Sequence, residues 1–259
     1  EVKKPMMFVH ARARLRQEKR HDEKAVVEEA PHRPSRVWSE KEVWEPGRLR
    51  PSPVALEAAP RTVSYCADFV SEAEEAALLG CLPEDDEALW TRVTGGRLVA
   101  KFDDEDMPPV LSRVTRDAPV LASNFVLLNS YAPGQGVMAH TDGPAYDPAA
   151  AALSLGQDRL IYFRERLAPS EVGRRDASSP VCSVLLRRRS LLRFDDDAYS
   201  AHTHGLDDLL DDLPVEVVGQ KAPCANLDLA GAKDGDELCI TDRRVSITVR
   251  RRRHGPTEE

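Results

Sequence analysis

The sequence predicts a mainly β protein in which two antiparallel sheets face each other as a double-stranded β-helix, or jelly roll, with flanking helices. Short segments rich in β-branched and apolar residues recur through the second half of the chain, and turn-rich loops separate most of them. The length of 259 residues also lies in the range in which an all-β barrel or sandwich forms one domain. One folded domain is therefore expected.

The chain divides into three predicted regions. Residues 1–60 carry many charges, several prolines and few large apolar groups, which is typical of a largely disordered N-terminal extension. Acidic residues within it argue against a transit peptide. Residues 61–253 are predicted to form the functional domain, and residues 254–259 a tail.

The first elements of the domain are a short strand at 63–65 and a helix over 71–79. Ser71 is a suitable N-cap for this helix, and Glu74 stands at the capping-box position. Residues 90–97 indicate a strand and a turn, and an acidic segment follows at 101–109. Seven further strands are predicted, at 124–131, 137–142, 159–165, 181–187, 190–194, 237–241 and 244–250.

Two low-complexity insertions, at 169–179 and 206–213, are expected to be surface loops, and the second could instead form a short acidic helix. No apolar segment is long enough for a membrane span, so no membrane partner is expected. The five cysteines are scattered and contain no Cys-x-x-Cys pair, which favours neither a disulfide framework nor a structural zinc site. An intracellular, reducing location in nucleus and cytoplasm is expected.

Three side chains form a candidate metal site. His140 and Asp142 are two residues apart, so on an extended segment both would leave the same face and could meet one ion. His204 is the candidate third ligand, and His202 competes with it because it shares the same strand face. Two histidines and one carboxylate are the facial triad of non-haem Fe(II) oxygenases. The alternative interpretation is a turn aspartate near a strand histidine.

The segment from Arg244 to Arg250 predicts a half-buried strand, because apolar and polar residues alternate along it. Both arginines share its polar face, about 20 Å apart along the strand. If their side chains lean inward, they could hold the two carboxylates of 2-oxoglutarate, because a guanidinium forms two parallel hydrogen bonds with a carboxylate. The alternative is a solvated basic strand face.

Read in order, these motifs resemble the AlkB-type Fe(II)/2-oxoglutarate dioxygenases over roughly residues 60–253. The resemblance rests on Asn129-x-Tyr131-x-Pro-Gly, His140-x-Asp142-Gly-Pro, Tyr199 with His204-Gly, and Arg244-x5-Arg250. The continuation of the second motif to Tyr146, Ser154-Leu-Gly156 and Arg189-Ser-Leu-Leu192 are similar to one branch of that family. The Tyr199 spacing and the glycine at 205 favour His204 over His202 as the third ligand.

The resemblance implies a role for each site residue. Fe(II) would be held by His140, Asp142 and His204, and molecular oxygen and 2-oxoglutarate would take its open positions. Asn129 and Tyr131 would hydrogen-bond 2-oxoglutarate. Arg244 is assigned to its distal carboxylate and Arg250 to the end nearer the iron, with the reverse assignment open.

The resemblance also implies an alkylated nucleic acid, DNA or RNA, as substrate. A monomer is expected. The net charge of −8 opposes strong non-specific binding to phosphates, but the basic runs 187–189 and 250–253 could form one local patch at the mouth of the site. The segment 101–109 is shorter than the substrate-covering lid of the family, which leaves the substrate open. The alternatives are a protein-directed oxygenase and a non-catalytic jelly-roll interaction module whose acidic loops bind basic partners.

Overall fold

The structure is a computed structural model, and it describes residues 43–57, 60–82, 84, 86–166, 179–209 and 214–253. Predictions for residues 1–42, most of the insertion at 169–179, residues 210–213 and the tail at 254–259 lie outside the described residues. The described residues belong to one compact unit. Among them, no helix is both long and apolar enough to span a membrane.

The larger of the two main sheets has eight strands, all paired antiparallel. Its central strand β14 is hydrogen-bonded to β5 on one side and to β7 on the other, which leaves no backbone edge exposed there. The strand order is β1 (Val54–Ala55), β2 (Val63–Cys66), β10 (Leu191–Asp195), β7 (Tyr146–Leu155), β14 (Arg244–Arg252), β5 (Phe125–Tyr131), β4 (Leu98–Asp103) and β3 (Thr91–Arg92).

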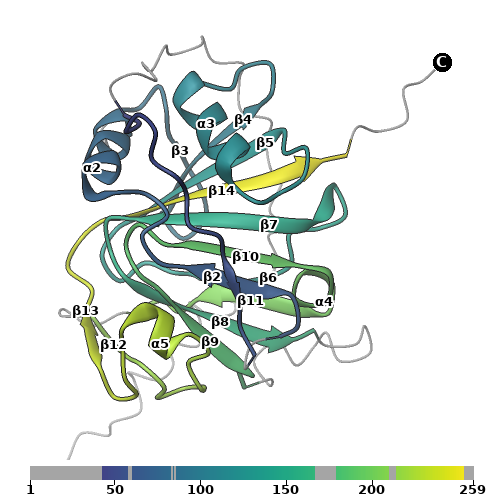
Figure 1. The fold of residues 1–259 in the computed structure, drawn as a ribbon. Helices are drawn as coiled ribbons and strands as arrows, with labels where there is room; N and C mark the ends of the chain where they lie inside the picture. Colours follow the sequence, from purple (N-terminus) through teal and green to yellow (C-terminus); the bar gives the residue numbers. More distant parts are fainter. Residues whose placement is uncertain are drawn as a thin grey trace, which may run out of the picture. The chain divides into compact units, whose positions relative to one another are not determined.

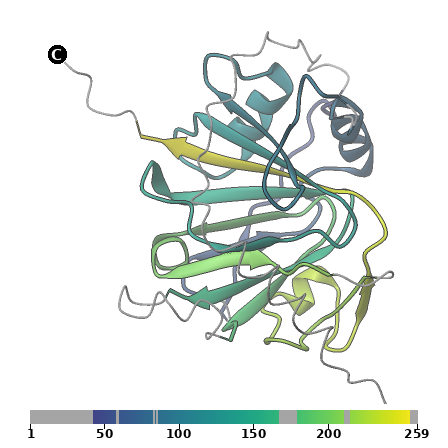
Figure 2. The same cartoon turned by 180° about the vertical axis from the view of Figure 1, so that it is seen from behind.

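The smaller main sheet has the order β6 (Val137–His140), β11 (His202–Leu206), β8 (Arg159–Glu165) and β9 (Cys182–Leu186). A buried apolar cluster joins its inner face to the larger sheet, with Tyr65, Leu192 and Phe194 from the larger sheet and Phe163 and Val184 from the smaller one. Figures 1 and 2 show the two sheets from opposite sides. The structure thus confirms the predicted mainly β fold of two facing antiparallel sheets.

Helices α2 (Glu72–Cys81) and α3 (Pro109–Asp117) pack on the outer face of the larger sheet through a second apolar cluster. The predicted capping box of α2 is confirmed: Ser71 Oγ accepts from the Glu74 N–H, and the Glu74 carboxylate accepts from the Ser71 N–H. The short helix α4 (Asp196–Ser200) joins β10 to β11. Against the outer face of the smaller sheet lie β12 (Val215–Val217), α5 (Leu227–Ala230) and β13 (Glu237–Cys239).

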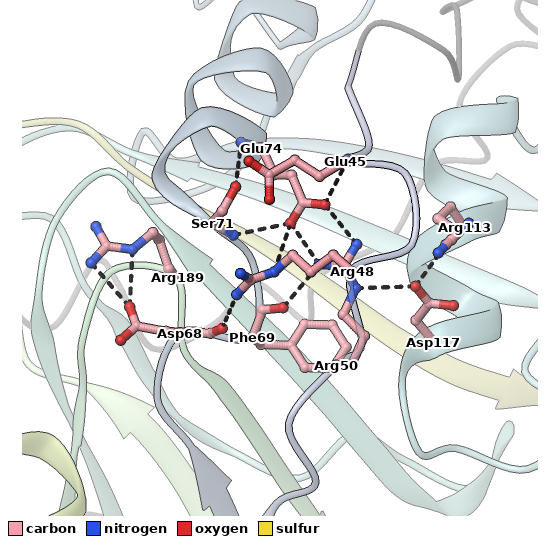
Figure 3. Close-up of polar contacts among 10 residues, drawn as sticks. All are labelled: Glu45, Arg48, Arg50, Asp68, Phe69, Ser71, Glu74, Arg113, Asp117 and Arg189. Carbon is pink, nitrogen blue, oxygen red and sulfur yellow. Dashed lines mark hydrogen bonds and ion pairs between the residues drawn. The ribbon is translucent and has the colours of Figure 1, made fainter.

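The segment that precedes β1 packs on the helical layer (Figure 3). Val43 and Trp44 are buried, and the Arg50 guanidinium pairs with Glu74 on α2 and with Asp117 on α3. Its Cζ also lies 5.0 Å from the centre of the Trp44 ring. Residues 43–50 of the predicted extension therefore add to the folded unit.

Among the elements that the sequence prediction lacks, β7, β4 and α3 are the most important for the site. β7 lies centrally, between β10 and β14, and residues 101–103 of the predicted acidic segment belong to β4. α3 occupies the end of that segment and the residues after it. These elements matter for function, because β4 and β7 complete the inner face opposite the candidate metal ligands.

Candidate functional site

The two candidate histidine ligands lie on neighbouring strands of the smaller sheet. His140 ends β6 and His204 lies within β11, and the two residues are paired partners in the antiparallel ladder. Paired residues project from the same face, and the two ring centres are 4.6 Å apart. Gly205 allows this close pairing, because a Cβ there would lie 2.7 Å from the carbonyl oxygen of Val137.

Asp142 completes the group from the turn that follows β6. The predicted strand 137–142 is therefore too long: it ends at His140, and Gly143 continues the turn at a φ of +82°. The buried Asp142 Oδ1 lies 3.8 Å from Nε2 of His140 and 3.8 Å from Nε2 of His204. The three ligand atoms lie within 4.8 Å of one another.

The hydrogen bonds of the group prepare it for a cation. His140 Nδ1 lies 2.9 Å from the Met138 carbonyl oxygen, so Nδ1 carries the proton and Nε2 offers its lone pair. Burial lowers the pKa of His204 to about 3, and the partial burial of His140 lowers its pKa as well. Both rings are therefore neutral at neutral pH, which is the form that binds metals. The Asp142 Oδ2 is buried without a hydrogen-bond partner among the described residues.

Two neutral imidazoles and one carboxylate, gathered at one point, fit a ferrous ion that keeps other coordination positions open. His202 is not part of this group of potential ligands: its Nδ1 lies 3.1 Å from the Asp197 carbonyl oxygen on α4. The structure thus brings His140, Asp142 and His204 together and places His202 elsewhere.

The polar face of β14 lies opposite the metal ligands. Arg244 is paired with Tyr131 on β5, and Ser246 is paired with Asn129. Arg250 reaches the metal group, since its Nη2 donates to Asp142 Oδ1. The other four residues are buried as well, so β14 presents one arginine beside the metal ligands and a second one six residues away on the same face.

The buried guanidinium groups lack enough protein partners. Arg244 donates from Nη2 to Ser154 Oγ at 2.9 Å, and its Cζ lies 5.2 Å from the centre of the Tyr131 ring. Burial lowers the pKa of Arg244. Its Nε and Nη1, and Nε of Arg250, have no hydrogen-bond partner in the described chain. A buried cation without partners is costly, so this strand fits an anion with two carboxylates, as 2-oxoglutarate has.

Several supporting residues were not predicted as site residues. The Phe194 ring centre lies 4.7 Å from that of His204 and the Phe163 ring centre 6.3 Å, so aromatic groups shield this ligand from water. Tyr199 Oη lies 3.5 Å from the Gly143 carbonyl oxygen and contacts the turn that carries Asp142. Phe194 lies at the end of a predicted strand, but the sequence does not show how the strands pair. Its contact with His204 therefore could not be predicted.

A buried ion pair fixes the backbone behind the metal ligands. Arg159 pairs with Glu216 at 3.0 Å and donates to the carbonyl oxygens of Gln135 and Asp207. Gln135 lies just before β6 and Asp207 just after β11, so one guanidinium ties together the ends of the two strands that carry the histidines. The sequence prediction gave Arg159 no role.

The prediction that the basic runs 187–189 and 250–253 form one patch is wrong, because the two runs lie at opposite ends of β14. Arg188 and Arg189 pair with Glu75, which also accepts from the N–H of Gly156, next to the Arg244 end. Arg252 pairs with Asp103 and Arg253 with Asp147 at the other end. These arginines are neutralised by carboxylates and form no joint patch.

Comparisons with known proteins agree with this geometry. A family model described as the 2OG-Fe(II) oxygenase superfamily matches residues 2–250. A protein of Danio rerio described as "Probable RNA/DNA demethylase ALKBH6" is 33% identical over 211 residues, covering 75% of this chain and 87% of that protein. ALKBH6 is the branch of the AlkB-type enzymes to which the motifs around residues 146, 154 and 189 are similar.

Solved structures give more distant likenesses. OsALKBH1 matches with a TM-score of 0.47 at 14% identity, covering 77% of this chain and 100% of that one. A Pseudomonas putida prolyl-4-hydroxylase matches with a TM-score of 0.43 at 14% identity, covering 75% and 94% of the two chains. Both TM-scores are below 0.5, so membership of the family is shown by the two sequence matches alone.

Proposed function

The chain belongs to the 2OG-Fe(II) oxygenase superfamily, and on this premise we propose that it is an AlkB-type dioxygenase that oxidatively demethylates an alkylated nucleic acid. The observation that carries the proposal is the convergence of His140, Asp142 and His204 opposite a strand with two buried arginines. The sequence relationship to ALKBH6, whose printed name is probable RNA/DNA demethylase, supports the nucleic acid as substrate.

His140, Asp142 and His204 are the proposed iron ligands. Bound iron would supply the oxidation, in which one oxygen atom of O₂ enters a C–H bond of the alkyl group and the other enters succinate as 2-oxoglutarate loses CO₂. The protein holds these three side chains in the orientation that binds the ion. The Met138 carbonyl fixes the tautomer of His140, and Arg250 holds the Asp142 carboxylate toward both rings.

The co-substrate assignments follow from the two ends of β14. We assign the distal carboxylate to Arg244, because it lies six residues from the arginine that contacts Asp142 and retains two unpartnered N–H groups. Arg250 takes the end near the iron. Asn129 and Tyr131 lie on β5 beside them, and their amide and hydroxyl groups supply further hydrogen bonds to the same anion.

The proposal is tested by oxygen-dependent succinate formation from 2-oxoglutarate, with and without an alkylated oligonucleotide. The alkylated oligonucleotide should stimulate turnover more than its unmodified counterpart, and His140→Ala should abolish turnover. His202→Ala is the matched control and should retain it, because His202 is outside the ligand group. Stimulation by a peptide and by no nucleic acid would select the protein-directed alternative. Absence of both iron and 2-oxoglutarate binding would select the non-catalytic one.

A further inference from the structure

Another arginine with a buried, unpartnered nitrogen lies near Tyr131, on the hairpin between β3 and β4. Arg97 directly precedes β4, and its Cζ lies 5.8 Å from the centre of the Tyr131 ring. The Cζ of Arg244 lies 5.2 Å from the same ring centre, so two guanidinium groups contact Tyr131. Nε of Arg97 is buried and has no hydrogen-bond partner among the described residues.

The register of β4 places a second cation in line with Arg97. Val99 is paired with Asn129 and Lys101 with Leu127, so residues 97, 99 and 101 face the site. The alternate residues Leu98 and Ala100 pack into the apolar cluster on the outer face. Lys101 is exposed and forms no salt bridge with any residue that the structure describes. Arg97 and Lys101 are thus about 13 Å apart along one strand face.

The hairpin is anchored to the loop that leads to the metal ligands. Gln135 donates from Nε2 to the Gly95 carbonyl oxygen at 3.2 Å and accepts at Oε1 from the Ala132 N–H at 2.8 Å. Gly96 has a φ of +86°, and a Cβ there would lie 2.8 Å from Gln135 Nε2. This contact requires a glycine and holds the hairpin that carries Arg97 against the loop that leads to β6.

The co-substrate does not account for these cations. Its two carboxylates correspond to Arg244 and Arg250, whereas Arg97 and Lys101 add two charges on the next strand but one. The arginines after Arg250 cannot serve the same purpose without breaking ion pairs, since Arg252 and Arg253 pair with Asp103 and Asp147. Because Arg97 and Lys101 form no salt bridge with the described residues and lie on one strand face, they are suited to a polyanion that passes along β4.

We propose that Arg97 and Lys101 bind the phosphodiester backbone of a single-stranded nucleic acid substrate and so direct an alkylated base toward His140 and His204. This inference rests on the proposed function and adds the residues that grip the substrate. The distance between the two cations spans more than one phosphate of a strand that lies along β4. The side chain of His140 is 42% exposed, so a bound base can reach the metal ligands.

The test measures binding apart from turnover. A fluorescein-labelled, unmodified single-stranded oligothymidylate of about ten nucleotides is titrated with the Mn(II)-loaded protein, and anisotropy is followed at several salt concentrations. We expect Arg97→Gln and Lys101→Gln each to weaken binding about three- to tenfold and to lower the slope of log Kd against log salt by about 0.7. Binding of 2-oxoglutarate to the same variants, followed by calorimetry, should stay within about twofold of wild type.

The matched control is Arg116→Gln, which removes one positive charge from α3 on the outer layer and should leave both affinities unchanged. Wild-type binding of oligothymidylate that Arg97→Gln and Lys101→Gln do not change, or no wild-type binding at all, would overturn the inference. A loss of 2-oxoglutarate affinity without a loss of oligonucleotide affinity would overturn it too and would assign Arg97 to the co-substrate. If the variants weaken oligonucleotide binding while no alkylated oligonucleotide stimulates turnover, the proposed function fails and this binding surface stands.

Discussion

Arg244 shows how a residue can favour function at the expense of stability. Its guanidinium is buried, burial lowers its pKa, and two of its nitrogens find no hydrogen-bond partner in the described chain. Burial of a charge without an opposite charge costs several kcal/mol. The cost is recovered when an anion binds, which is the expected behaviour of a pre-organised carboxylate site.

We therefore predict that Arg244→Met raises the melting temperature of the ligand-free protein by a few degrees and weakens 2-oxoglutarate binding about 100-fold or more. Differential scanning calorimetry and a 2-oxoglutarate titration measure the two effects.

Arg243→Met is the control for this prediction. Arg243 donates to Ser130 Oγ and to the Leu82 carbonyl oxygen. Successive residues of a strand face opposite sides of the sheet, so Arg243 points away from the face that carries Arg244. This variant should melt at a lower temperature and keep its affinity for 2-oxoglutarate. A lower melting temperature for Arg244→Met would contradict the account of an uncompensated charge.

At the scale of elements, sequence alone predicts strands whose pattern is strong and misses those that neighbours impose. β14 follows from its alternation of valine and isoleucine with polar residues, and its arginines emerge on one face as expected. β7 contains a proline and a run of four alanines, which are weak strand formers, and it forms because β10 and β14 bond to it on both sides.

The candidate site shows the same difference between residues that a local pattern reveals and residues that strand pairing brings in. The spacing of His140 and Asp142 and of the two arginines is local and readable, so these residues could be nominated from the sequence. Arg97 and Phe194 join the site through strand register, which no spacing records. The contacts between residues on paired strands therefore could not be predicted from the sequence.

Helix α2 joins the N-terminal segment to the domain through one carboxylate, and this makes a pH-dependent contribution (Figure 3). Burial alone would raise the pKa of Glu74, but hydrogen bonds from Arg50 and from the N–H groups of Ser71 and Glu45 bring it below its usual value. A lowered pKa stabilises the fold above the ordinary carboxyl pKa of 4.5, and the contribution disappears as pH falls through the folded value.

Glu74→Gln should therefore lower the free energy of unfolding at pH 7, by at most about 3–5 kcal/mol, because Arg50 loses one of its two carboxylate partners and keeps Asp117. The difference from wild type should begin to shrink as pH falls below 4.5, and it should be smallest once pH has passed the lower pKa of folded Glu74, where wild-type Glu74 is protonated as well. Urea denaturation at a series of pH values measures this. Glu72→Gln, an exposed change in the same helical turn, should show neither effect; a Glu74→Gln deficit that persists unchanged at acidic pH would contradict the assignment.

The ion pair of Arg159 and Glu216 should affect metal binding as well as stability, because Arg159 holds the ends of β6 and β11. Glu216→Gln leaves a buried guanidinium without its carboxylate, and we expect a loss of about 3–5 kcal/mol in unfolding free energy. Metal affinity should fall with it, because Gln135 and Asp207 flank the two histidine strands. Cobalt titration of the folded variant checks this, and a destabilised variant with wild-type metal affinity would show that the pair supports the fold alone.

At the scale of the whole molecule, the two sheets contribute different halves of one site. The smaller sheet supplies the imidazoles, and the larger sheet supplies the arginines, the asparagine and the tyrosine. A ligand that contacts both sheets binds the folded state and not the unfolded chain, so it stabilises the fold by mass action.

We predict that Mn(II) alone raises the melting temperature and that 2-oxoglutarate raises it further when Mn(II) is present. At a ligand concentration of about 100 times Kd the gain is about 2.7 kcal/mol. In Asp142→Ala neither addition should act, whereas in Arg244→Met the first should act and the second should not. An equal response of Arg244→Met to 2-oxoglutarate would contradict the assignment of that arginine.

The central position of β14 links catalytic competence to the accuracy of folding. Its pairing with β5 and β7 puts Arg244, Ser246 and Arg250 on one face, and a slip of a single residue would turn all three toward the helical layer and the valines toward the metal ligands. Such a misfolded chain could retain its strands and its compactness, yet it could not bind 2-oxoglutarate. Affinity for this small anion therefore reports whether the sheet has assembled in its correct alignment.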